Sequence, residues 1–334
     1  MTDLKVYVAI RPDEFDTLYS PQAQDRLRSL AAVDVAAGDG RAVLPADVAA
    51  GYDVIVTSWS TAPFDPRTVR GPRLRLAAHT AGSVRGLFPR AMLENGLRVT
   101  QGGAAAMAPA VAELAVTLTL ALLRNLHRHD RELWTSRDWA TARQPVLGRS
   151  LAERRVGVVG LSRVGWRYVS MVRGLGVETV HAYDPYADPT AAADAGVELA
   201  GLDDLFATCD VVAVHAPSTD ETRHLVGARQ LAALADGSIL VNTARSWSVD
   251  QDALLREVRS GRILAGLDVF DEEPLPADSG FLGLPNVIVT PHVAGGTVEA
   301  RRQQGAIVVD ELARFAAGDA LLHEVTLGAY DRLA

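Results

Sequence analysis

Three polar residues with the side chains of a proton-transfer and anion-binding site each follow a short apolar run of the sequence. Arg245 follows ILVNTA, Glu273 follows LDVFDE and His292 follows VIVTP. Ligands of an open α/β sheet bind beyond the carboxyl ends of its strands. If the three runs are strands, they deliver a cation, an acid and a titratable base to one crevice.

Together these groups could assist the transfer of a hydride to and from a carbon that bears oxygen. Removal of hydride from an alcohol carbon leaves a proton, which a neutral imidazole such as that of His292 can take, and the reverse reaction needs the imidazolium as acid. A carboxylate on the far ring nitrogen, here Glu273, fixes the tautomer and stabilises the imidazolium. A guanidinium such as that of Arg245 binds a substrate carboxylate through two parallel hydrogen bonds and polarises the neighbouring carbonyl.

Each of the three residues also fits an ordinary structural role when it is taken alone. A histidine after a strand is usually structural, and Arg245 could pair with a surface acid. Glu273 and its acidic neighbours Asp271 and Glu272 could form a solvated turn. The shared position at strand ends favours the catalytic interpretation over three unrelated ones.

A glycine-containing turn upstream of these residues indicates a dinucleotide site. The stretch from Arg155 to Pro185 has the pattern of strand, tight turn, helix and second strand, about half of a nucleotide-binding fold. Gly160 and Gly165 hold the first and third glycine positions of GxGxxG, and the free amides that open the helix suit a pyrophosphate. Asp184 lies 184 − 165 = 19 residues further on, where an acid binds ribose hydroxyls and repels a 2′-phosphate. The turn therefore favours NAD over NADP.

The motif is imperfect because Ser162 stands at its second glycine position. Absence of a side chain there lets the backbone approach the phosphate. Serine is small enough to be tolerated, and its hydroxyl could bind the phosphate. A strand-to-helix turn without any nucleotide would show the same glycines, so the flanking βαβ pattern and Asp184 are what favour the dinucleotide.

Short apolar runs alternate with helical patterns over the rest of the chain, which predicts parallel sheets covered by helices. Two such sets, one before residue 100 and one after residue 150, imply two doubly wound α/β domains. The expected strands are Val6–Ile10, Asp53–Thr57, Leu74–Ala78, Leu97–Thr100, Val180–Tyr183, Val211–His215, Ile239–Asn242, Leu264–Phe270 and Val287–Thr290. The expected helices are Pro21–Leu30, Ala228–Leu234, Asp250–Arg259 and a closing helix that starts at Thr297.

The residues between the two sets predict one long helix over Gly102–His129. Val111 and Leu118 belong to a series of apolar residues at helical intervals, and Pro109 suits a first turn. The alanine-rich segment Gly103–Ala108 resembles a hinge, and a plain linker of small residues fits its composition equally well.

Composition limits the classes of function. The 334 residues carry a formal charge of 33 − 41 = −8 without a basic run, which argues against nucleic acid or a membrane surface as partner. Cys209 is the only cysteine, so an internal disulfide and a thiolate metal cluster are excluded, and no metal site is expected. Lys5 is the only lysine, which argues against a Schiff-base lysine. The N-terminus is not signal-like and no apolar stretch is expected to span a membrane, so a soluble cytoplasmic protein is expected.

The sequence resembles the D-isomer-specific 2-hydroxyacid dehydrogenases over almost its whole length. The resemblance lies in AVAELAVTLTLALLR, VGVVGLSRVG, HAYDPY, HAPSTDETRHLV, ILVNTARSWSVDQDALLREVRSGRILAGLDVFDEEPLP and NVIVTPHVAGGT. It implies that Arg245, Glu273 and His292 are catalytic, with Arg245 also binding substrate. The NAD contacts that it implies are Gly160, Ser162, Arg163, Val164, Gly165, Asp184, His215, Ala216, Thr243, Ala244 and, at the nicotinamide carboxamide, Asp268. Thr80, Ala81 and Gly82 match the loop whose amides bind the substrate carboxylate.

The same resemblance implies an architecture. Residues 108–295 would form a Rossmann NAD-binding domain, and residues 1–107 with 296–334 would form a flavodoxin-like substrate domain. The family also implies a homodimer built on the middle domain around the helix after Pro109, with a cleft that closes over its ligands.

Several positions depart from the family pattern. Ser162 and Ser246 replace family glycines, Trp247 follows, and the loop HTAGSVR differs from the usual wording. The leading hypothesis is an NAD-dependent oxidoreductase that interconverts a small D-2-hydroxy acid and its 2-keto acid, with glyoxylate, hydroxypyruvate and 3-phosphoglycerate as candidates. A non-catalytic NAD-binding module, like the corepressors that share this fold, is the alternative, because it would keep the same three residues.

Overall fold

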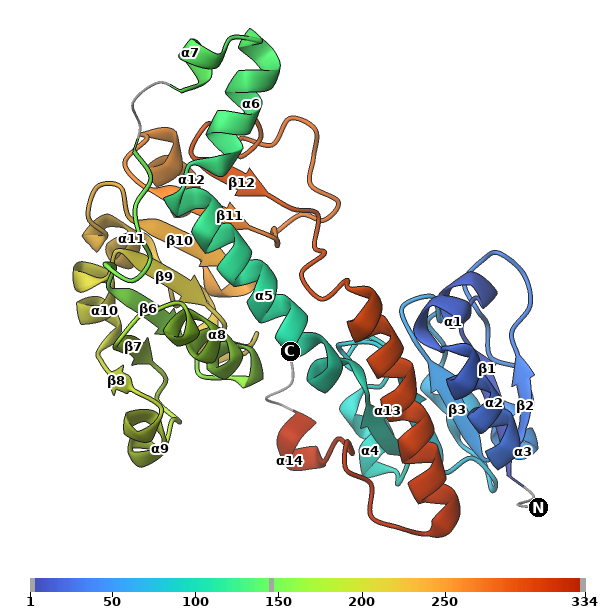
Figure 1. Cartoon of the computed structure of the whole chain (residues 1–334). Helices are drawn as coiled ribbons and strands as arrows, with labels where there is room; N and C mark the ends of the chain where they lie inside the picture. Colours follow the sequence, from blue (N-terminus) through green and yellow to red (C-terminus); the bar gives the residue numbers. More distant parts are fainter. Residues whose placement is uncertain (1–3, 144–146, 331–334) are drawn as a thin grey trace. The chain divides into compact units, whose positions relative to one another are not determined.

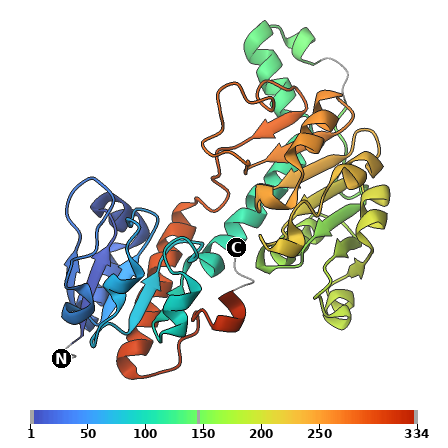
Figure 2. The ribbon, with the colours of Figure 1, turned by 180° about the vertical axis from the view of Figure 1, so that it is seen from behind.

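A computed structural model of the chain describes residues 4–143 and 147–330. The chain divides into two compact units, one made of Met1–Met107 with Gly296–Ala334 and the other of Ala108–Gly295. Each unit is built around one parallel sheet, and the colours of Figures 1 and 2 follow the chain through both. The expected fold class of two parallel-sheet α/β domains is confirmed.

The sheet of the first unit has five strands in the order β2-β1-β3-β4-β5. This is the 2-1-3-4-5 order of flavodoxin-like folds. The strands are β1 (Lys5–Ala9), β2 (Ala32–Val35), β3 (Val54–Thr57), β4 (Leu76–His79) and β5 (Arg98–Gln101). All of their pairings are parallel, so their carboxyl ends share one edge.

Helices cover both faces of this sheet, because successive strand residues point to opposite sides and both sides are apolar. One face carries a cluster with Val6 and Leu76 under three helices, and the other carries a cluster with Ile55 and Val99 under short ones. The helices of the first face are α1 (Pro12–Leu18), α2 (Pro21–Leu30) and α13 (Val298–Ala317). The second face has α3 (Val48–Gly51), η1 (Pro66–Val69), α4 (Arg90–Glu94) and α14 (Leu327–Tyr330).

The sheet of the second unit has seven strands in the order β12-β11-β10-β9-β6-β7-β8. Counted from β6, this is the 3-2-1-4-5-6 order of a Rossmann sheet with one strand added. The direction of the order reverses at β6, and sheets of this kind bind dinucleotides beyond the carboxyl end of that strand. The strands are β6 (Val156–Val159), β7 (Val180–Tyr183), β8 (Val197–Leu199), β9 (Val211–Val214), β10 (Ile239–Asn242), β11 (Leu264–Leu267) and β12 (Val287–Val289).

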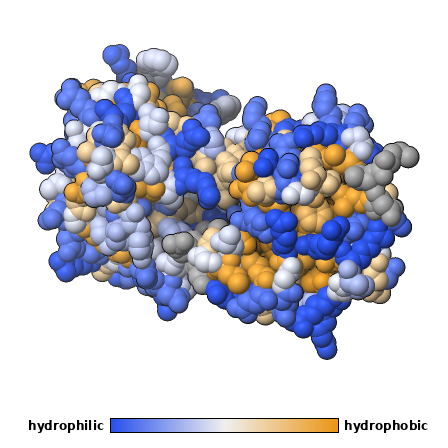
Figure 3. Space-filling view, turned by 90° about the horizontal axis from the view of Figure 1, so that it is seen from below, coloured by the Kyte–Doolittle hydropathy of each residue, from blue (hydrophilic) through white to orange (hydrophobic). Residues whose placement is uncertain are grey.

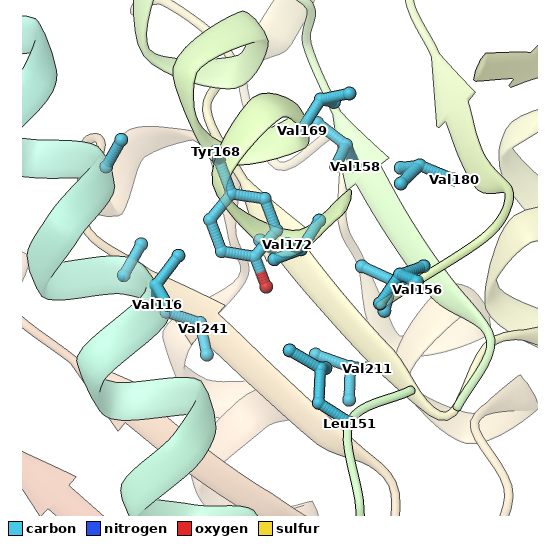
Figure 4. Close-up of a cluster of buried hydrophobic side chains, with 14 of the residues drawn as sticks. Val116, Leu151, Val156, Val158, Tyr168, Val169, Val172, Val180, Val211 and Val241 are labelled. Atoms are coloured by element: carbon cyan, nitrogen blue, oxygen red, sulfur yellow. The ribbon is translucent and has the colours of Figure 1, made fainter. Parts of the chain in front are cut away.

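Two apolar clusters hold helices against the two faces of this larger sheet. On the face of α5 (Gly103–Leu123) and α8 (Arg163–Gly174), Tyr168 points between α5 and the strands, as Figure 4 shows. Its hydroxyl lies 3.0 Å from Oγ1 of Thr119. The opposite face is covered by α10 (Leu202–Thr208), α11 (Ala228–Ala233) and α12 (Gln251–Arg259). The remaining elements are α6 (Leu126–Ser136), α7 (Trp139–Ala142), α9 (Pro189–Asp194), η2 (Asp220–Thr222) and η3 (Ser246–Ser248).

The single helix expected over Gly102–His129 is wrong, because the chain forms two helices there. Asn125 separates α5 from α6 with a φ of 52°, in the left-handed region, where an α-helix cannot continue. Pro109 lies inside α5 instead of in a first turn, and the alanine-rich segment before it is helical instead of a linker. The boundary between the two units therefore falls within a helix.

The expectation that no apolar stretch reaches membrane-spanning length is also wrong. Among the residues that the structure describes, α5 is long and apolar enough by length and composition. However, 56% of its apolar window is buried inside the protein, and a core helix of a soluble protein passes the same test. Hydrophilic side chains cover much of the face drawn in Figure 3.

Candidate active site

The three predicted catalytic residues all lie in the second unit, at the carboxyl edge of its sheet. Arg245 follows β10, Glu273 follows β11 and His292 follows β12, and these three strands are neighbours. Parallel pairing places their carboxyl ends side by side. The topology therefore brings the three residues to one end of the sheet.

Glu273 and His292 are in direct contact. Nδ1 of His292 lies 2.6 Å from Oε2 of Glu273, and the amide of Phe270 donates to Oε1 at 2.9 Å. Burial opposes ionisation of Glu273, but the hydrogen bonds from His292 and Phe270 outweigh it and hold the pKa of Glu273 below its ordinary value. A carboxylate can only accept hydrogen bonds, so the contact places the ring proton on Nδ1 and leaves Nε2 free to exchange a proton with a substrate.

Asp268 fixes the segment that carries His292. Its Oδ1 accepts from the Thr290 hydroxyl at 2.5 Å and the Val293 amide at 2.9 Å, and its Oδ2 accepts from the Ala294 amide at 2.9 Å. The amide of His292 itself donates to the Asp268 carbonyl at 3.0 Å. His292 has a φ of 53°, a strained conformation that these surrounding bonds hold in place. Asp268 is fully buried, and through these hydrogen bonds it positions the segment of the histidine. Its predicted contact with the nicotinamide stays a prediction.

Arg245 is fixed by a turn that its neighbours build. The Asn242 side chain accepts from the Ala244 amide at 3.0 Å and donates to the Arg245 carbonyl at 3.0 Å. The Ser248 hydroxyl donates to the same carbonyl at 3.1 Å. Burial lowers the pKa of Arg245, and the nearby Glu273 carboxylate opposes that shift, so the group remains a cation. A partly desolvated guanidinium is suited to binding a carboxylate.

The glycine turn between β6 and α8 has the geometry of a phosphate-binding turn. Gly160 has a φ of 93°, which disfavours other residues, and a side chain there would meet the Ala216 amide nitrogen at 2.8 Å. A side chain at Gly165 would collide with the Gly160 carbonyl. Arg163 and Val164 open α8, so their amides lack intrahelical partners and can face an anion.

Ser162 caps α8. Its hydroxyl donates to the His215 carbonyl at 3.0 Å and accepts from the Gly165 amide at 3.5 Å. The backbone engages this hydroxyl in the structure, and its expected contact with the phosphate stays a prediction. The serine thus gives a hydrogen-bond partner to the Gly165 amide, one of the free amides at the start of α8.

Asp184 ends β7 beside the same turn. Its Oδ2 accepts from the Leu161 amide at 2.7 Å and its Oδ1 from the Tyr186 amide at 2.9 Å. Each oxygen of a carboxylate can accept a second hydrogen bond, so the acid is fixed in place and still able to bind ribose hydroxyls. This is the arrangement that the sequence predicts for NAD.

Two further predicted cofactor residues have buried polar atoms without a partner among the described residues. These atoms are both ring nitrogens of His215 and the hydroxyl of Thr243. Burial lowers the pKa of His215 to about 3, so its ring is neutral. His215 and Ala216 follow β9, and Thr243 and Ala244 follow β10. These residues lie at the same edge of the sheet as the glycine turn, which follows β6. Buried polar groups normally have partners, so the residues present fit a bound dinucleotide at this edge.

The predicted substrate loop belongs to the first unit. Oγ1 of Thr80 lies 2.7 Å from the Tyr19 hydroxyl, and the carbonyl of Thr80 accepts from the Gln304 side chain at 2.8 Å. Small residues pack the loop, because a side chain at Gly103 would collide with the Ala81 backbone and one at Gly82 would crowd Met107. Thr80 and Ala81 are buried, so the loop has a fixed backbone.

Several residues that position the site were not predicted from the sequence. Gln251 accepts from the Asp271 amide at 3.2 Å and donates to the Val269 carbonyl at 3.1 Å, which holds the segment leading to Glu273. Asn242 and Gln304 act in the same way on their loops. For Asn242, the available signal was a polar residue at the end of an apolar run, as in ILVN. Among residues 4–143 and 147–330, no cluster of His, Cys, Asp and Glu could hold a metal ion.

Comparisons with known proteins identify the family to which the chain is similar. The family model described as D-isomer specific 2-hydroxyacid dehydrogenase, NAD binding domain, matches residues 116–294. Hydroxypyruvate reductase of Thermotoga maritima is 33% identical over 264 residues, covering 78% of this chain and 83% of that protein. D-3-phosphoglycerate dehydrogenase of Archaeoglobus fulgidus is 36% identical over 217 residues, covering 65% of this chain but 40% of that protein. The structure of D-2-hydroxyisocaproate dehydrogenase matches with a TM-score of 0.81 at 25% identity, covering 96% of this chain and 99% of that one.

Proposed function

Because the chain belongs to the D-isomer specific 2-hydroxyacid dehydrogenases, we propose that Arg245, Glu273 and His292 are the catalytic residues of its hydride transfer. The protein is an NAD-dependent oxidoreductase that acts on the CH–OH group of a 2-hydroxy acid. The observation that supports the residue assignment best is the contact of 2.6 Å between Nδ1 of His292 and Oε2 of Glu273.

The bound cofactor supplies or accepts the hydride at its nicotinamide ring. In oxidation of the hydroxy acid, Nε2 of His292 takes the hydroxyl proton, and in reduction of the keto acid it returns that proton to oxygen. Glu273 holds the Nδ1 proton and stabilises the imidazolium. The guanidinium of Arg245 binds the substrate carboxylate and polarises the carbonyl. Within the first unit, the amides of Thr80, Ala81 and Gly82 are the proposed carboxylate-binding group.

We propose a small 2-keto acid and its D-2-hydroxy acid as substrates. Glyoxylate and hydroxypyruvate are candidates, since hydroxypyruvate reductase is a relative over most of both chains. 3-Phosphoglycerate is a candidate as well, and this chain covers 40% of the phosphoglycerate dehydrogenase that it matches.

The experiment is a turnover assay with NADH and a panel of 2-keto acids. Wild-type protein should consume NADH with at least one of them, and His292→Asn should lower kcat by roughly 10²- to 10⁴-fold, because it removes the acid/base group. His323→Asn, a histidine of the first unit outside the site, is the control and should keep the wild-type rate. If wild-type protein reduces none of the acids, a non-catalytic NAD-binding role like that of a corepressor is favoured instead.

We also propose that the protein is a cytoplasmic homodimer without a nucleic-acid or membrane partner. No residue of α6 is buried in the single chain, and Leu133, Trp134 and Trp139 of α6 and α7 are exposed. Exposed aromatic residues of this kind anchor interfaces, so a second copy is the proposed cover. Light scattering of the purified chain should give twice the monomer mass, and Trp134→Ala with Trp139→Ala should lower it.

A further inference from the structure

The first unit presents an indole on a rigid turn after β3. The Ser58 hydroxyl and the Ser60 amide donate to the two carboxylate oxygens of Glu14 at 2.7 and 3.0 Å. The Ser58 amide donates to Oγ1 of Thr61 at 2.9 Å. Trp59 lies between these bonds and is nevertheless 45% exposed. A fixed backbone with its polar groups satisfied therefore holds a large apolar side chain at the surface.

Arg301 of α13 lies against this indole. Its guanidinium carbon is 4.1 Å from the centroid of the Trp59 ring, within the range of a cation–π contact. One long hydrogen bond of 3.4 Å joins its Nη1 to Oε1 of Gln304. Within the described part of the chain, no carboxylate forms an ion pair with Arg301, and its other N–H groups have no acceptor.

Apart from its contact with Trp59, the placement of Arg301 has no evident benefit for stability. The residue lies in the first turns of α13, near the positive end of the helix dipole, where a cation is unfavourable. Burial lowers the pKa of Arg301, and the carboxylate of Glu14, which Ser58 and Ser60 already engage, only partly offsets this. The neighbouring Arg302 differs, because its Nη1 donates to the Asp16 carbonyl at 2.8 Å. A cation held without an acidic partner is suited to binding an anionic ligand.

Gln304 connects Arg301 to the predicted substrate loop. Its Oε1 accepts from Arg301, and its Nε2 donates to the carbonyl of Thr80 at 2.8 Å. Gln304 is fully buried, so it holds both groups in fixed positions. The loop and the guanidinium are therefore two anion-binding groups of the same unit, separated by one side chain.

We propose that Arg301, held on Trp59, binds a second acidic group of the substrate, so that the enzyme prefers a dianionic 2-keto acid. This inference rests on the proposed function, in which the loop at Thr80 binds the first carboxylate. The guanidinium fork matches a carboxylate or a phosphate through two parallel hydrogen bonds. The indole of Trp59 covers the short carbon chain that joins the two anionic groups.

The test compares pairs of 2-keto acids of similar chain length that differ in the terminal charge. The pairs are 2-oxobutyrate with oxaloacetate, 2-oxovalerate with 2-oxoglutarate, and hydroxypyruvate with its phosphate ester. In at least one pair, wild-type protein should show a kcat/KM for the dianion that is about tenfold or more above that for its partner, since a hydrogen bond to a charged group contributes on the order of ten- to hundredfold. The pair with the largest ratio distinguishes a carboxylate from a phosphate.

Arg301→Gln should lower this ratio by roughly ten- to hundredfold, mainly through KM of the dianion. Arg301→Lys, which keeps the charge but loses the planar fork, should restore part of the ratio, and a purely structural role predicts no such rescue of selectivity. Arg302→Gln is the matched control and should leave the ratio unchanged. Should Arg301→Gln not fold, the wild-type ratios and the ratios of Trp59→Ala test the inference. Trp59→Ala should then lower the kcat/KM ratio, and an unchanged ratio would overturn the inference.

The outcomes separate this inference from the function on which it rests. If acids are reduced but every wild-type ratio is one or less, or if Arg301→Gln leaves the ratios unchanged, the inference is overturned and the dehydrogenase assignment stands. If no acid is reduced, both are overturned.

Discussion

The carboxylate of Glu273 is held by two donors, which are the ring of His292 and the amide of Phe270. This single side chain therefore orients the ring of the proposed acid/base group. Because its pKa lies below the ordinary value, Glu273 stays ionised through the neutral range and into mild acid. An ionised partner favours the imidazolium that reduction needs.

Glu273→Gln removes that charge while keeping the shape. We expect kcat for keto-acid reduction to fall by roughly 10- to 100-fold, because an amide stabilises the imidazolium less than a carboxylate does. The alkaline limb of the pH–rate profile for reduction should also move to lower pH. Steady-state rates from pH 5 to 10 measure both effects.

Glu272→Gln is the control for this prediction, since the adjacent acid is exposed and outside the contact. It should reproduce the wild-type profile. A Glu273→Gln profile with an unmoved alkaline limb would mean that the carboxylate does not act on the acid/base group.

At the residue scale, the sequence predicted the acid, the base and the cation but not the residues that position them. Strand ends are visible as apolar runs that stop, and the three chemical groups follow directly. Asn242 and Gln251 are ordinary polar residues whose partners are backbone atoms, and a sequence does not show which backbone atoms lie near. Trp59 and Arg301 are 301 − 59 = 242 residues apart, so only the fold brings them together.

At the scale of elements, the segment after β12 depends on one buried acid. Asp268 accepts three hydrogen bonds from Thr290, Val293 and Ala294. Asp268→Asn would turn an amide N–H toward one of these donors. We expect the free energy of unfolding to fall by about 2–3 kcal/mol and kcat to fall as His292 loses its fixed position.

Urea unfolding and steady-state kinetics measure these two effects. Asp271→Asn, an exposed acid near the same edge, should change neither quantity. A stable Asp268→Asn variant with the wild-type kcat would show that the segment keeps its conformation without this acid.

The sheet of the first unit has an acid that joins the starts of three strands. Asp53, before β3, accepts from the Lys5 amide of β1 at 2.9 Å, and from Arg73 and Arg75 before β4 at 2.9 and 3.3 Å. Burial opposes its ionisation, but hydrogen bonds from Arg73 and the Lys5 amide outweigh it and lower the pKa of Asp53 below 3.8. The native state therefore favours the charged form.

This shift fixes the sign of a pH effect. A carboxyl group whose pKa is depressed by folding stabilises the protein above its unfolded pKa, and the stabilisation is lost as pH falls through the folded pKa. Asp53→Asn should lower the free energy of unfolding by about 2 kcal/mol at pH 7. The difference from wild type should shrink below pH 3.8. Urea titrations at pH 7 and pH 3 measure it, and an equal difference at both values would contradict the account.

Burial explains which strands were predicted from the sequence and which were missed. The central strands are apolar on both faces, as in VIVT of β3 and VVAV of β9, and every such run was predicted. The edge strands β2 and β8 were missed because they are short and partly exposed, with an acid in AVDV and in VEL. The break at Asn125 was missed because nothing in the sequence distinguishes an asparagine that ends a helix from one that continues it.

At the scale of the whole molecule, the prediction of two doubly wound sheets is confirmed, because alternating strand and helix patterns permit few other arrangements. The topological reversal at β6 and the glycine turn after it coincide, which is why a dinucleotide site was predictable from a degenerate motif. Substrate choice was not predictable, because the side chains that we propose to govern it, Trp59 and Arg301, come from distant segments.

The first unit is built from both ends of the chain, and this has a consequence for biosynthesis. Val308, Val309 and Leu312 of α13 complete the apolar cluster on one face of the five-stranded sheet. On the ribosome, the nascent chain therefore carries that face uncovered while all of residues 108–295 are translated. The seven-stranded unit can fold as it emerges, whereas its companion has to wait for the closing helix.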